Sequence, residues 1–201
     1  ISDYHFTSLD IYKKKVIKIC NNPKTVFNFG SIGAYNMKSL KKIKIFKNTK
    51  FKKKILVSYH SSTNAVAQSR KDFLELLKAL SKLKEHLIFF TYPGHDLDSD
   101  FIIKNLKKFK KLNNNCILTK NTTEFSFGEL LYNFDVLVGN SSSGIIEAPS
   151  ANIATINIGD RQKGRIAGPS VYNVKGYSED IYRMIIKVLD DKKIVFKNPY
   201  Y

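Results

Sequence analysis

The sequence is short of cysteine, arginine and long apolar runs, and each shortage excludes a class of protein. The only cysteines, Cys20 and Cys116, stand alone in apolar segments. No pair has metal-ligand spacing, so we expect reduced core thiols and neither a disulfide framework nor a metal. No apolar run approaches the roughly 20 residues of a membrane span, and the N-terminus lacks a signal-peptide pattern. We therefore predict a cytoplasmic protein without a membrane partner.

Positive charge is abundant, although arginine is scarce. The formal net charge is +17, and only four of the 34 basic residues are arginines: Arg70, Arg161, Arg165 and Arg183. The lysines lie along helix faces, in stretches such as LKKFKKL. Nucleic-acid binders usually concentrate basic and base-reading residues on one face. We therefore interpret the lysines as a solvated surface and predict no nucleic-acid partner, although the field would attract a small anionic substrate.

Short apolar strands alternate with amphipathic helices through most of the chain. The predicted strands cover residues 54–59, 87–91, 116–119, 135–138, 154–158 and 171–174. Helices with apolar residues three or four apart follow the first three strands, and a last helix carries Ile181 and Ile185. This alternation favours an α/β fold with an open, doubly wound parallel sheet. Before it, a strand, a helix and a strand are predicted, then a helix from Ala34 to Ile43.

Ligands of doubly wound sheets bind beyond the carboxyl ends of the strands, so the residues that follow each strand are candidates. They are His60, the segment YPGHD, the segment GNSSSG from Gly139 and the segment GDRQKGR from Gly159. In a parallel sheet these four segments converge on one edge. The convergence predicts a ligand site there more strongly than any single motif does.

The segment GNSSSG has two interpretations. Gly139 allows close backbone approach, and Ser141, Ser142 and Ser143 stand at the start of a short predicted helix. A helix N-terminus with hydroxyls around it binds anions such as pyrophosphate, but plain N-capping would also explain the serines. The loop is not a Walker A motif, because no Gly-Lys-Ser/Thr follows. Glu147, placed inside that helix, would either accept hydrogen bonds from a ribose diol or favour the helix dipole.

Arginine and histidine supply the other candidates. Arg161 and Arg165 stand in a loop rich in glycine, which is typical of phosphate and carboxylate binding. His60 is a candidate acid, base or phosphate partner, although a histidine after a strand is often a plain hydrogen-bonding residue. His95 has aspartates nearby but no third ligand at plausible spacing, so we predict no metal. No Gly-x-Ser-x-Gly elbow occurs, which argues against a serine hydrolase.

Two motifs carry a family resemblance. The segments VGNSSSGIIEAPS and TINIGDRQKGR strongly resemble the hydrolysing UDP-N-acetylglucosamine 2-epimerases of sialic-acid and legionaminic-acid synthesis. The segment ILVSYHSST is similar to the start of that family's second domain, and YHFTSLDIYKKKVI with VFNFGSIGAYN is similar to the end of its first domain. The resemblance covers essentially the whole chain.

The resemblance implies the two-domain GT-B architecture, with the nucleotide sugar between two Rossmann-like domains. It divides the chain into a remnant of the first α/β domain (1–45), a linker (46–53), a UDP-binding Rossmann-like domain (54–177) and a C-terminal helix and tail that pack back on the first domain (178–201). The family's acidic catalytic residues and first glycine-rich loop lie upstream of anything matched. We therefore expect a C-terminal portion that does not turn over substrate alone.

The resemblance also implies a reaction and roles for residues. The hydrogen at C2 of the sugar is removed and UDP is eliminated to give a glycal, and water then adds with inversion at C2. The substrate would be UDP-N-acetylglucosamine or a 2,4-diacetamido analogue, with no cofactor, in a homo-oligomer. Ser141 and Ser142 would contact the pyrophosphate, Glu147 the ribose hydroxyls and Arg161 the nucleotide, with His60 as the catalytic or phosphate-side histidine. Secondary contacts would come from Gly139, Asn140, Ser143 and Arg165.

Two alternatives of other classes stay open. A GT-B glycosyltransferase would use the same nucleotide-binding half but transfer the sugar to an acceptor. A non-catalytic nucleotide-sugar-binding module would bind without turnover. One departure from the family lies at Pro93-Gly94, where several members carry Pro-Asn, so the resemblance does not carry over a side-chain contact from that loop.

Overall fold

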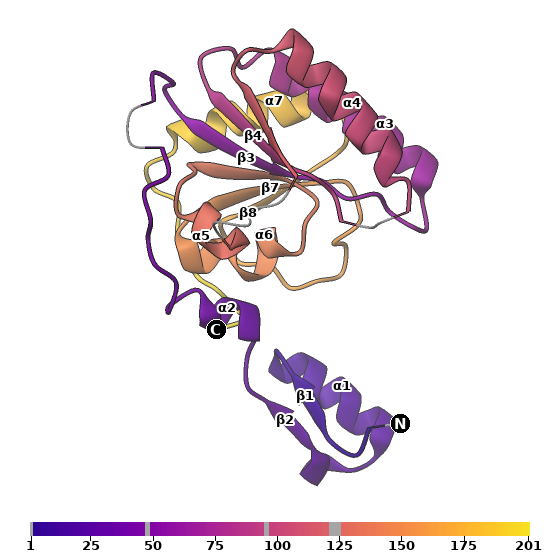
Figure 1. Ribbon diagram of the computed structural model, residues 1–201. Coiled ribbons are helices and arrows are strands. Elements are labelled where there is room, and N and C mark those ends of the chain that lie inside the picture. Colours follow the sequence, from indigo (N-terminus) through magenta and orange to yellow (C-terminus); the bar gives the residue numbers. More distant parts are fainter. Residues whose placement is uncertain (1, 47–48, 95–96, 121–125) are drawn as a thin grey trace.

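Six parallel strands form the central sheet of the computed structural model, which describes residues 2–46, 49–94, 97–120 and 126–201. The strand order is β5-β4-β3-β6-β7-β8 (Figure 1). The strands are β3 (Lys54–Ser58), β4 (Leu87–Thr91), β5 (Cys116–Thr119), β6 (Val136–Gly139), β7 (Ala154–Ile158) and β8 (Val171–Val174). Every pairing between neighbours is parallel. The predicted doubly wound α/β fold is confirmed.

Helices and one extended segment cover the two faces of this sheet. On one face lie α3 (Val66–Ser81), α4 (Ser99–Leu112) and α7 (Ser178–Asp190). On the other face lie α5 (Phe127–Leu131), the short 3₁₀ helix η2 (Ala148–Ala151) and residues 37–46. The strands alternate accordingly, since Ile55 and Val57 belong to the first layer of core and Leu56 belongs to the second. A strand buried on both faces must be apolar throughout, which is why these runs were recognisable in the sequence.

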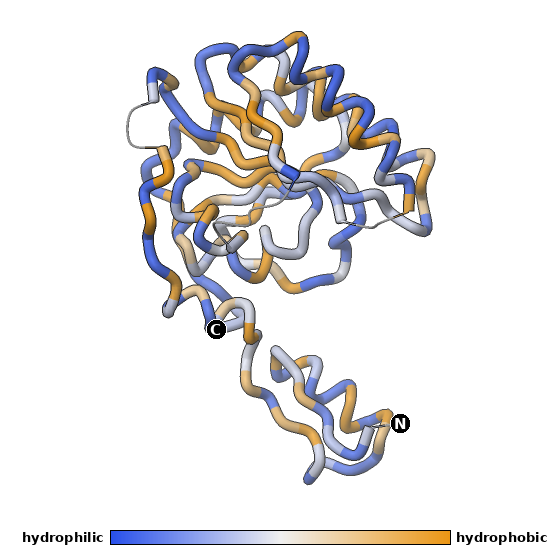
Figure 2. Tube along the Cα trace, in the orientation of Figure 1, coloured by the Kyte–Doolittle hydropathy of each residue, from blue (hydrophilic) through white to orange (hydrophobic). Residues whose placement is uncertain are grey.

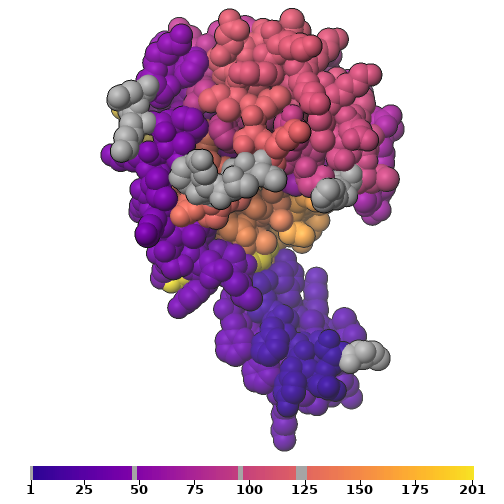
Figure 3. All heavy atoms as spheres, in the orientation of Figure 1, coloured from indigo at the N-terminus to yellow at the C-terminus, as the bar shows by residue number. Residues whose placement is uncertain are grey.

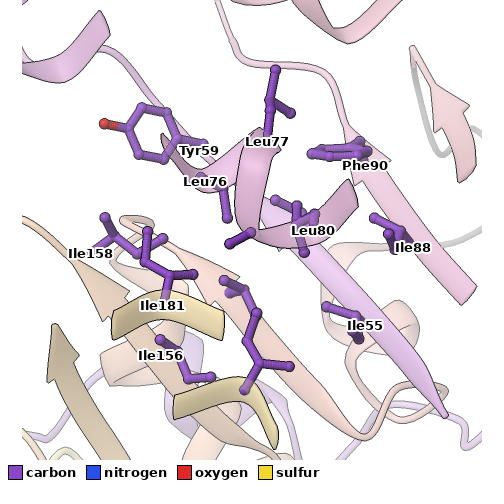
Figure 4. Packing of buried hydrophobic residues seen from close by; sticks show 14 of the residues in the cluster. Ile55, Tyr59, Leu76, Leu77, Leu80, Ile88, Phe90, Ile156, Ile158 and Ile181 are labelled. Atoms are coloured by element: carbon purple, nitrogen blue, oxygen red, sulfur yellow. The ribbon is translucent and has the colours of Figure 1, made fainter. Parts of the chain in front are cut away.

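The larger core lies between the sheet and helices α3 and α7. Leu76 and Leu80 of α3 and Ile55 of β3 belong to this cluster, in which Ile181 of α7 lies over Ile156 (Figure 4). All five side chains are 0% exposed, and burying a side chain of this size stabilises a fold by about 1.5–3 kcal/mol. The hydropathy colouring shows the same arrangement of the core, since the apolar strands lie inside and the polar faces of the helices lie outside (Figure 2).

The N-terminal residues form a second, smaller unit that projects from the main body (Figures 1 and 3). It consists of β1 (His5–Thr7), α1 (Asp10–Cys20), the 3₁₀ helix η1 (Pro23–Thr25) and β2 (Val26–Asn28). Strands β1 and β2 pair in parallel. Phe6, Phe27 and Phe29 stack with ring centroids 5.8–5.9 Å apart. Phe6 and Phe29 are 70% and 72% exposed, so this aromatic face is largely open to solvent.

The helix predicted from Ala34 to Ile43 is wrong in extent. Helix α2 covers only Ile32–Asn36. Met37 is then buried against the sheet, and the ring of Phe46 packs edge-on against those of Phe89 and Phe134 with centroids 5.9 and 5.5 Å away. After Asn36 the chain leaves the helix and runs along the sheet, where residues 37–46 add apolar side chains to the core.

The C-terminal tail connects the two units, because Tyr200 belongs to one buried cluster with Leu9, the N-cap residue of α1, and Ile145 of α6. Tyr200 is 3% exposed and its carbonyl accepts a hydrogen bond from the Ser31 backbone N–H at 2.8 Å. Asn198 Nδ2 donates to the Ile146 carbonyl and to Ser150 Oγ, both at 2.7 Å. The domain boundaries given above stay predictions. No helix among the described residues is long and apolar enough to cross a bilayer.

Candidate functional site

The sheet reverses its strand order between β3 and β6. From β3 the chain winds outward through β4 and β5, and then returns to place β6 on the other side of β3. The loops after two such strands diverge and leave a crevice at their carboxyl ends, which is the usual ligand position in open α/β sheets. His60 follows β3 and the segment Asn140–Ser143 follows β6, so both predicted loops lie at this crevice.

Gly139 allows the two strands to end side by side. It pairs with Ser58 across the β3–β6 ladder and has a φ of +144°. A Cβ at this position would lie 2.0 Å from the Ser58 carbonyl oxygen, far inside van der Waals contact. Glycine is therefore required here for both conformation and space.

Asn140 joins the ends of three strands. Its Oδ1 accepts from the His60 backbone N–H at 2.8 Å and its Nδ2 donates to the His60 carbonyl at 2.8 Å. Its own carbonyl accepts from Arg161 Nη1 at 3.0 Å and from Gln162 Nε2 at 2.8 Å. Asn140 is 3% exposed. One buried residue thus fixes the loops that follow β3, β6 and β7 relative to one another.

A pocket of about 470 Å³ opens at this point, and we call it the β3/β6 pocket. Five of the predicted site residues line it: His60, Ser141, Ser142, Ser143 and Arg161. The structure therefore brings together the histidine, the serines and the first arginine of the motifs. Gly139 and Asn140 are not among its lining residues, and Asn140 lines the neighbouring cavity instead.

The serines stand at the start of α6 (Ser143–Ile146). Ser142 is the N-cap residue, but its side chain makes no capping hydrogen bond. Ser141 Oγ accepts a long hydrogen bond from the Ser143 N–H at 3.4 Å. Capping therefore does not account for the Ser142 hydroxyl, which lines the pocket.

Sequence reasoning found only part of a second wall of the β3/β6 pocket. Tyr92 and Gly94 belong to the predicted YPGHD segment and line this wall. Thr91 at the end of β4, Thr119 and Lys120 at the end of β5, and Phe127 of α5 also line it but were not predicted. Phe127 stands in an apolar helix, where the sequence alone indicates a core residue. The rule that ligands lie beyond strand ends points to Thr91, Thr119 and Lys120 as well, but their residue types form no motif.

Glu147 lies elsewhere than predicted. Helix α6 ends at Ile146, and Glu147 is its C-cap residue, so its expected position inside the helix is wrong. The carboxylate lies against Gly33 of α2, where a Cβ would stand 2.2 Å from Oε1. Oε2 is buried without a hydrogen-bond partner. Burial raises the pKa of Glu147, and the Ser143 side chain opposes this only in part.

A larger cavity of about 890 Å³ adjoins the first, and we call it the β7/β8 pocket. It lies at the ends of β3, β7 and β8 and beside the start of α3. Arg165 lines this cavity and not the β3/β6 pocket, whereas Arg161 lines both. Both arginines of the GDRQKGR segment therefore line the β7/β8 pocket, and of the two only Arg161 also lines the β3/β6 pocket.

The acidic residues of the YPGHDLD segment have no ligand role that the structure describes. His95 and Asp96 lie outside the described residues. Asp98 is paired with Arg70, whose Nε donates to Oδ2 at 2.8 Å. Within the described ranges, no three His, Cys, Asp or Glu side chains gather as a metal site would require.

Comparison with known proteins assigns the family. The sequence model described as UDP-N-acetylglucosamine 2-epimerase matches residues 1–201. The chain belongs to this family. The resemblance recognised from the two motifs is confirmed.

This epimerase-family chain is similar to two curated bacterial proteins. It is 37% identical over 211 residues to the polysialic acid biosynthesis protein P7 of Escherichia coli, covering 100% of this chain and 54% of that protein. It is 35% identical over 173 residues to the GDP/UDP-N,N'-diacetylbacillosamine 2-epimerase (hydrolyzing) of Campylobacter jejuni, covering 83% of this chain and 45% of that protein. The chain thus spans about half the length of these relatives.

Solved structures of the epimerase family share the fold. The UDP-GlcNAc 2-epimerase of Neisseria meningitidis, solved with UDP-GlcNAc bound, superimposes with a TM-score of 0.69 at 18% identity. The match covers 99% of this chain and 57% of that one. At this identity the likeness establishes the fold alone.

Proposed function

We propose that this chain is the nucleotide-binding portion of a hydrolysing UDP-sugar 2-epimerase. Its substrate would be UDP-N-acetylglucosamine or a 2,4-diacetamido analogue, in the synthesis of sialic or legionaminic acid. The observation that carries the proposal is the Asn140 hydrogen-bond set, which holds His60 and Arg161 in a pocket that the serines also line, at the sheet's switch point. The names of the Escherichia coli and Campylobacter relatives agree with it.

In this proposal the β3/β6 pocket receives UDP. Ser141 and Ser142 donate hydrogen bonds to the diphosphate, and Arg161 supplies the opposite charge. A guanidinium near phosphate oxygens makes charge-assisted hydrogen bonds, which are about twice as strong as neutral ones. The ring of Phe127, in an otherwise polar pocket, offers an apolar surface for the base.

Glu147 is proposed as the acceptor for the ribose diol. It follows Ser143, a residue of the pocket wall, by one helical turn. Its buried Oε2 has no hydrogen-bond partner, and a buried acceptor without a donor is costly. A diol would satisfy it if the side chain turned from Gly33 toward the pocket.

His60 is proposed to act at the diphosphate or as an acid or base during elimination of UDP. Its backbone is fixed on both sides by Asn140, and Ser58 Oγ lies 3.5 Å from His60 Nε2. The group that removes the C2 hydrogen is not among the proposed site residues. We therefore expect no turnover by these 201 residues. We also retain homo-oligomeric assembly and a cytoplasmic location as predictions.

The test is calorimetric titration of UDP into the 201-residue chain. Loss of a charge-assisted contact costs about 1.5–3 kcal/mol, so Arg161→Gln should weaken UDP binding about 10-fold or more. Arg183→Gln, on the exposed side of α7, is the matched control and should leave affinity unchanged. Absence of UDP binding by the native chain would refute the proposal.

Turnover by the complete protein distinguishes the reaction classes. Release of a free sugar from UDP-N-acetylglucosamine without an added acceptor supports the hydrolysing epimerase. Turnover that requires an added acceptor would identify a glycosyltransferase. Binding of the nucleotide sugar without turnover would identify a non-catalytic binding module.

A further inference from the structure

A groove between helices α3 and α4 has no part in the proposed function. Its volume is about 610 Å³, and it is lined by residues of these two helices and of the short segments that follow them. No described residue lines both this α3/α4 groove and either pocket at the strand ends. We propose that the α3/α4 groove binds an acidic amphipathic helix of a partner protein, with apolar side chains on its floor and carboxylates at its rim.

The floor of the α3/α4 groove is apolar. It is formed by Leu74 and Leu77 of α3 and by Phe109 and Leu112 of α4. Leu77 and Phe109 are 9% and 6% exposed and belong to the larger core, whereas Leu74 and Leu112 are 40% and 71% exposed. Single exposed leucines are common on protein surfaces. Two that line the same groove form an apolar surface which a partner would remove from water.

The rim of the α3/α4 groove is positively charged. Four lysines line it, and all four are exposed: Lys71, Lys78, Lys84 and Lys108. A basic rim around an apolar floor matches a helix whose apolar stripe is flanked by Asp and Glu, since complementary charges at the edge of an interface speed association and fix orientation. The segment LKKFKKL therefore supplies both parts of the groove, the cation of Lys108 and the apolar side chains of Phe109 and Leu112.

The chain itself neutralises only part of this rim. Among the described residues that line the groove, the one carboxylate is Glu75. It accepts from Lys78 Nζ at 2.5 Å and from the Ser178 backbone N–H at 3.0 Å. Lys71 and Lys108 form no ion pair with a described residue. Two cations beside the apolar floor therefore stay available to the carboxylates of a partner.

The shape of the groove favours a helix as its occupant. Helices α3 and α4 lie side by side (Figure 1), and the α3 residues that line the groove run from Lys71 to Ser81. This length is about three helical turns, or about 15 Å. A partner helix of similar length would place anchors at i, i+3, i+4 and i+7 on the floor. A flat anionic membrane would contact the exposed lysines but could not follow the concave floor.

The chain offers no better occupant of its own. A second copy also carries a formal net charge of +17, so a basic groove would repel it. The N-terminal unit projects from the main body at a distance from α3 and α4 (Figure 1) and does not cover the groove. An acidic partner relieves the positive charge that a second copy would double.

The experiment uses two synthetic peptides of about 14 residues, each cross-linked between side chains to hold the helix, because short isolated helices are marginal in water. The stripe peptide carries leucines at i, i+3, i+4 and i+7 with glutamates on both sides. The control peptide has the same composition, with its leucines spread around the helix. Fluorescence anisotropy measures the binding of each peptide to the 201-residue chain.

Two groove variants each have a control that changes the net charge equally. Leu112→Asp acts at a position that is 71% exposed, so folding should tolerate it, and Val195→Asp, at a position in the C-terminal tail that is 64% exposed, is its control. Lys108→Glu reverses a rim charge, and Lys104→Glu, at an exposed position of α4 outside the groove, is its control. Circular dichroism checks that all four variants fold.

The stripe peptide should bind about 10-fold more tightly than the control peptide. Each groove variant should weaken its binding about 10-fold, as loss of an interface anchor does, and each control variant should leave it within about twofold. Equal binding of the two peptides, or equal losses in groove and control variants, would indicate general charge attraction and overturn the inference.

Two further measurements examine the other occupants. Sedimentation that shows self-association of the native chain, abolished by Leu112→Asp, would assign the groove to a second copy. Binding to phosphatidylglycerol vesicles that Leu112→Asp abolishes, with no binding of the stripe peptide, would assign it to a membrane surface. Either result would overturn the inference, and neither depends on whether the chain binds UDP.

Discussion

The side chain of Asn140 hydrogen-bonds both backbone groups of His60, accepting from its N–H and donating to its C=O, each at 2.8 Å. A terminal amide offers a donor and an acceptor at this spacing, which an ionised carboxylate does not. The histidine after β3 is therefore held by a residue that follows β6, 80 positions later. We expect the site to depend on this amide as much as on the groups that face the ligand.

Asn140→Asp should keep one of the two hydrogen bonds to the His60 backbone and remove the other. The carboxylate still accepts from the His60 N–H, but it cannot donate and faces the His60 carbonyl with a negative charge. Leaving a buried acceptor unsatisfied costs about 1–3 kcal/mol, so urea denaturation should show a loss of that size, with weaker UDP binding. Asn114→Asp, at an exposed position, is the control. Equal stability of the two variants would contradict the role given to Asn140.

Gly139→Ala should destabilise the fold strongly. The new Cβ would meet the Ser58 carbonyl oxygen at 2.0 Å, and the φ of +144° is strained for any residue with a side chain. Strain of this kind alone costs about 1–3 kcal/mol, and separating β3 from β6 adds to it. Gly94→Ala is the matched control, because nothing lies within 4 Å of its added Cβ. Thermal melting of both variants checks this, and similar melting temperatures would refute it.

Glu147→Gln should alter how stability depends on pH. Burial raises the pKa of Glu147, so the folded chain binds this proton more tightly than the unfolded chain does. The stabilising effect of the protonated side chain is present below the unfolded pKa of about 4.3 and is lost as pH rises through the folded pKa. Denaturation at several pH values should therefore show the glutamine variant gaining stability relative to the native chain as pH rises.

Glu129→Gln is a control variant, for which the stability should depend on pH in the opposite direction. Hydrogen bonds from the Ser126 N–H and hydroxyl lower the pKa of Glu129. Its stabilising effect is present above the unfolded pKa and is lost as pH falls through the folded pKa. A stability difference for Glu147→Gln that does not change with pH, while Glu129→Gln responds, would contradict the burial of Glu147.

Asn198→Ala should loosen the connection between the N-terminal unit and α6. Asn198 donates to the Ile146 carbonyl and to Ser150 Oγ, and it accepts from the Tyr200 N–H at 2.9 Å. Each hydrogen bond contributes about 0.5–1.5 kcal/mol. Hydrogen exchange of the Ser31 amide, which bonds to the Tyr200 carbonyl, should become faster. Lys192→Ala, at an exposed position of the same tail, should leave that exchange unchanged.

The sequence by itself determined the sheet and the edge on which a ligand would bind. Strands β4, β5, β7 and β8 begin and end where the apolar runs do, β3 ends one residue earlier than predicted, and β6 begins and ends one residue later. Strands covered on both faces must be apolar throughout, and parallel strands place their following loops together. The apolar run of a strand and the residues that follow it are features of one short segment. They can therefore be recognised without knowing which other segments pack against it.

Only the tertiary structure decided which of the edge residues meet. It placed Arg161 between two cavities, left Arg165 in one of them and put Phe127 in the wall of the other. It also ended α2 at Asn36 and turned Glu147 toward Gly33. These positions depend on burial against segments distant in the sequence and on hydrogen bonds such as those of Asn140. No local pattern of residues encodes a contact between two segments that are 80 positions apart.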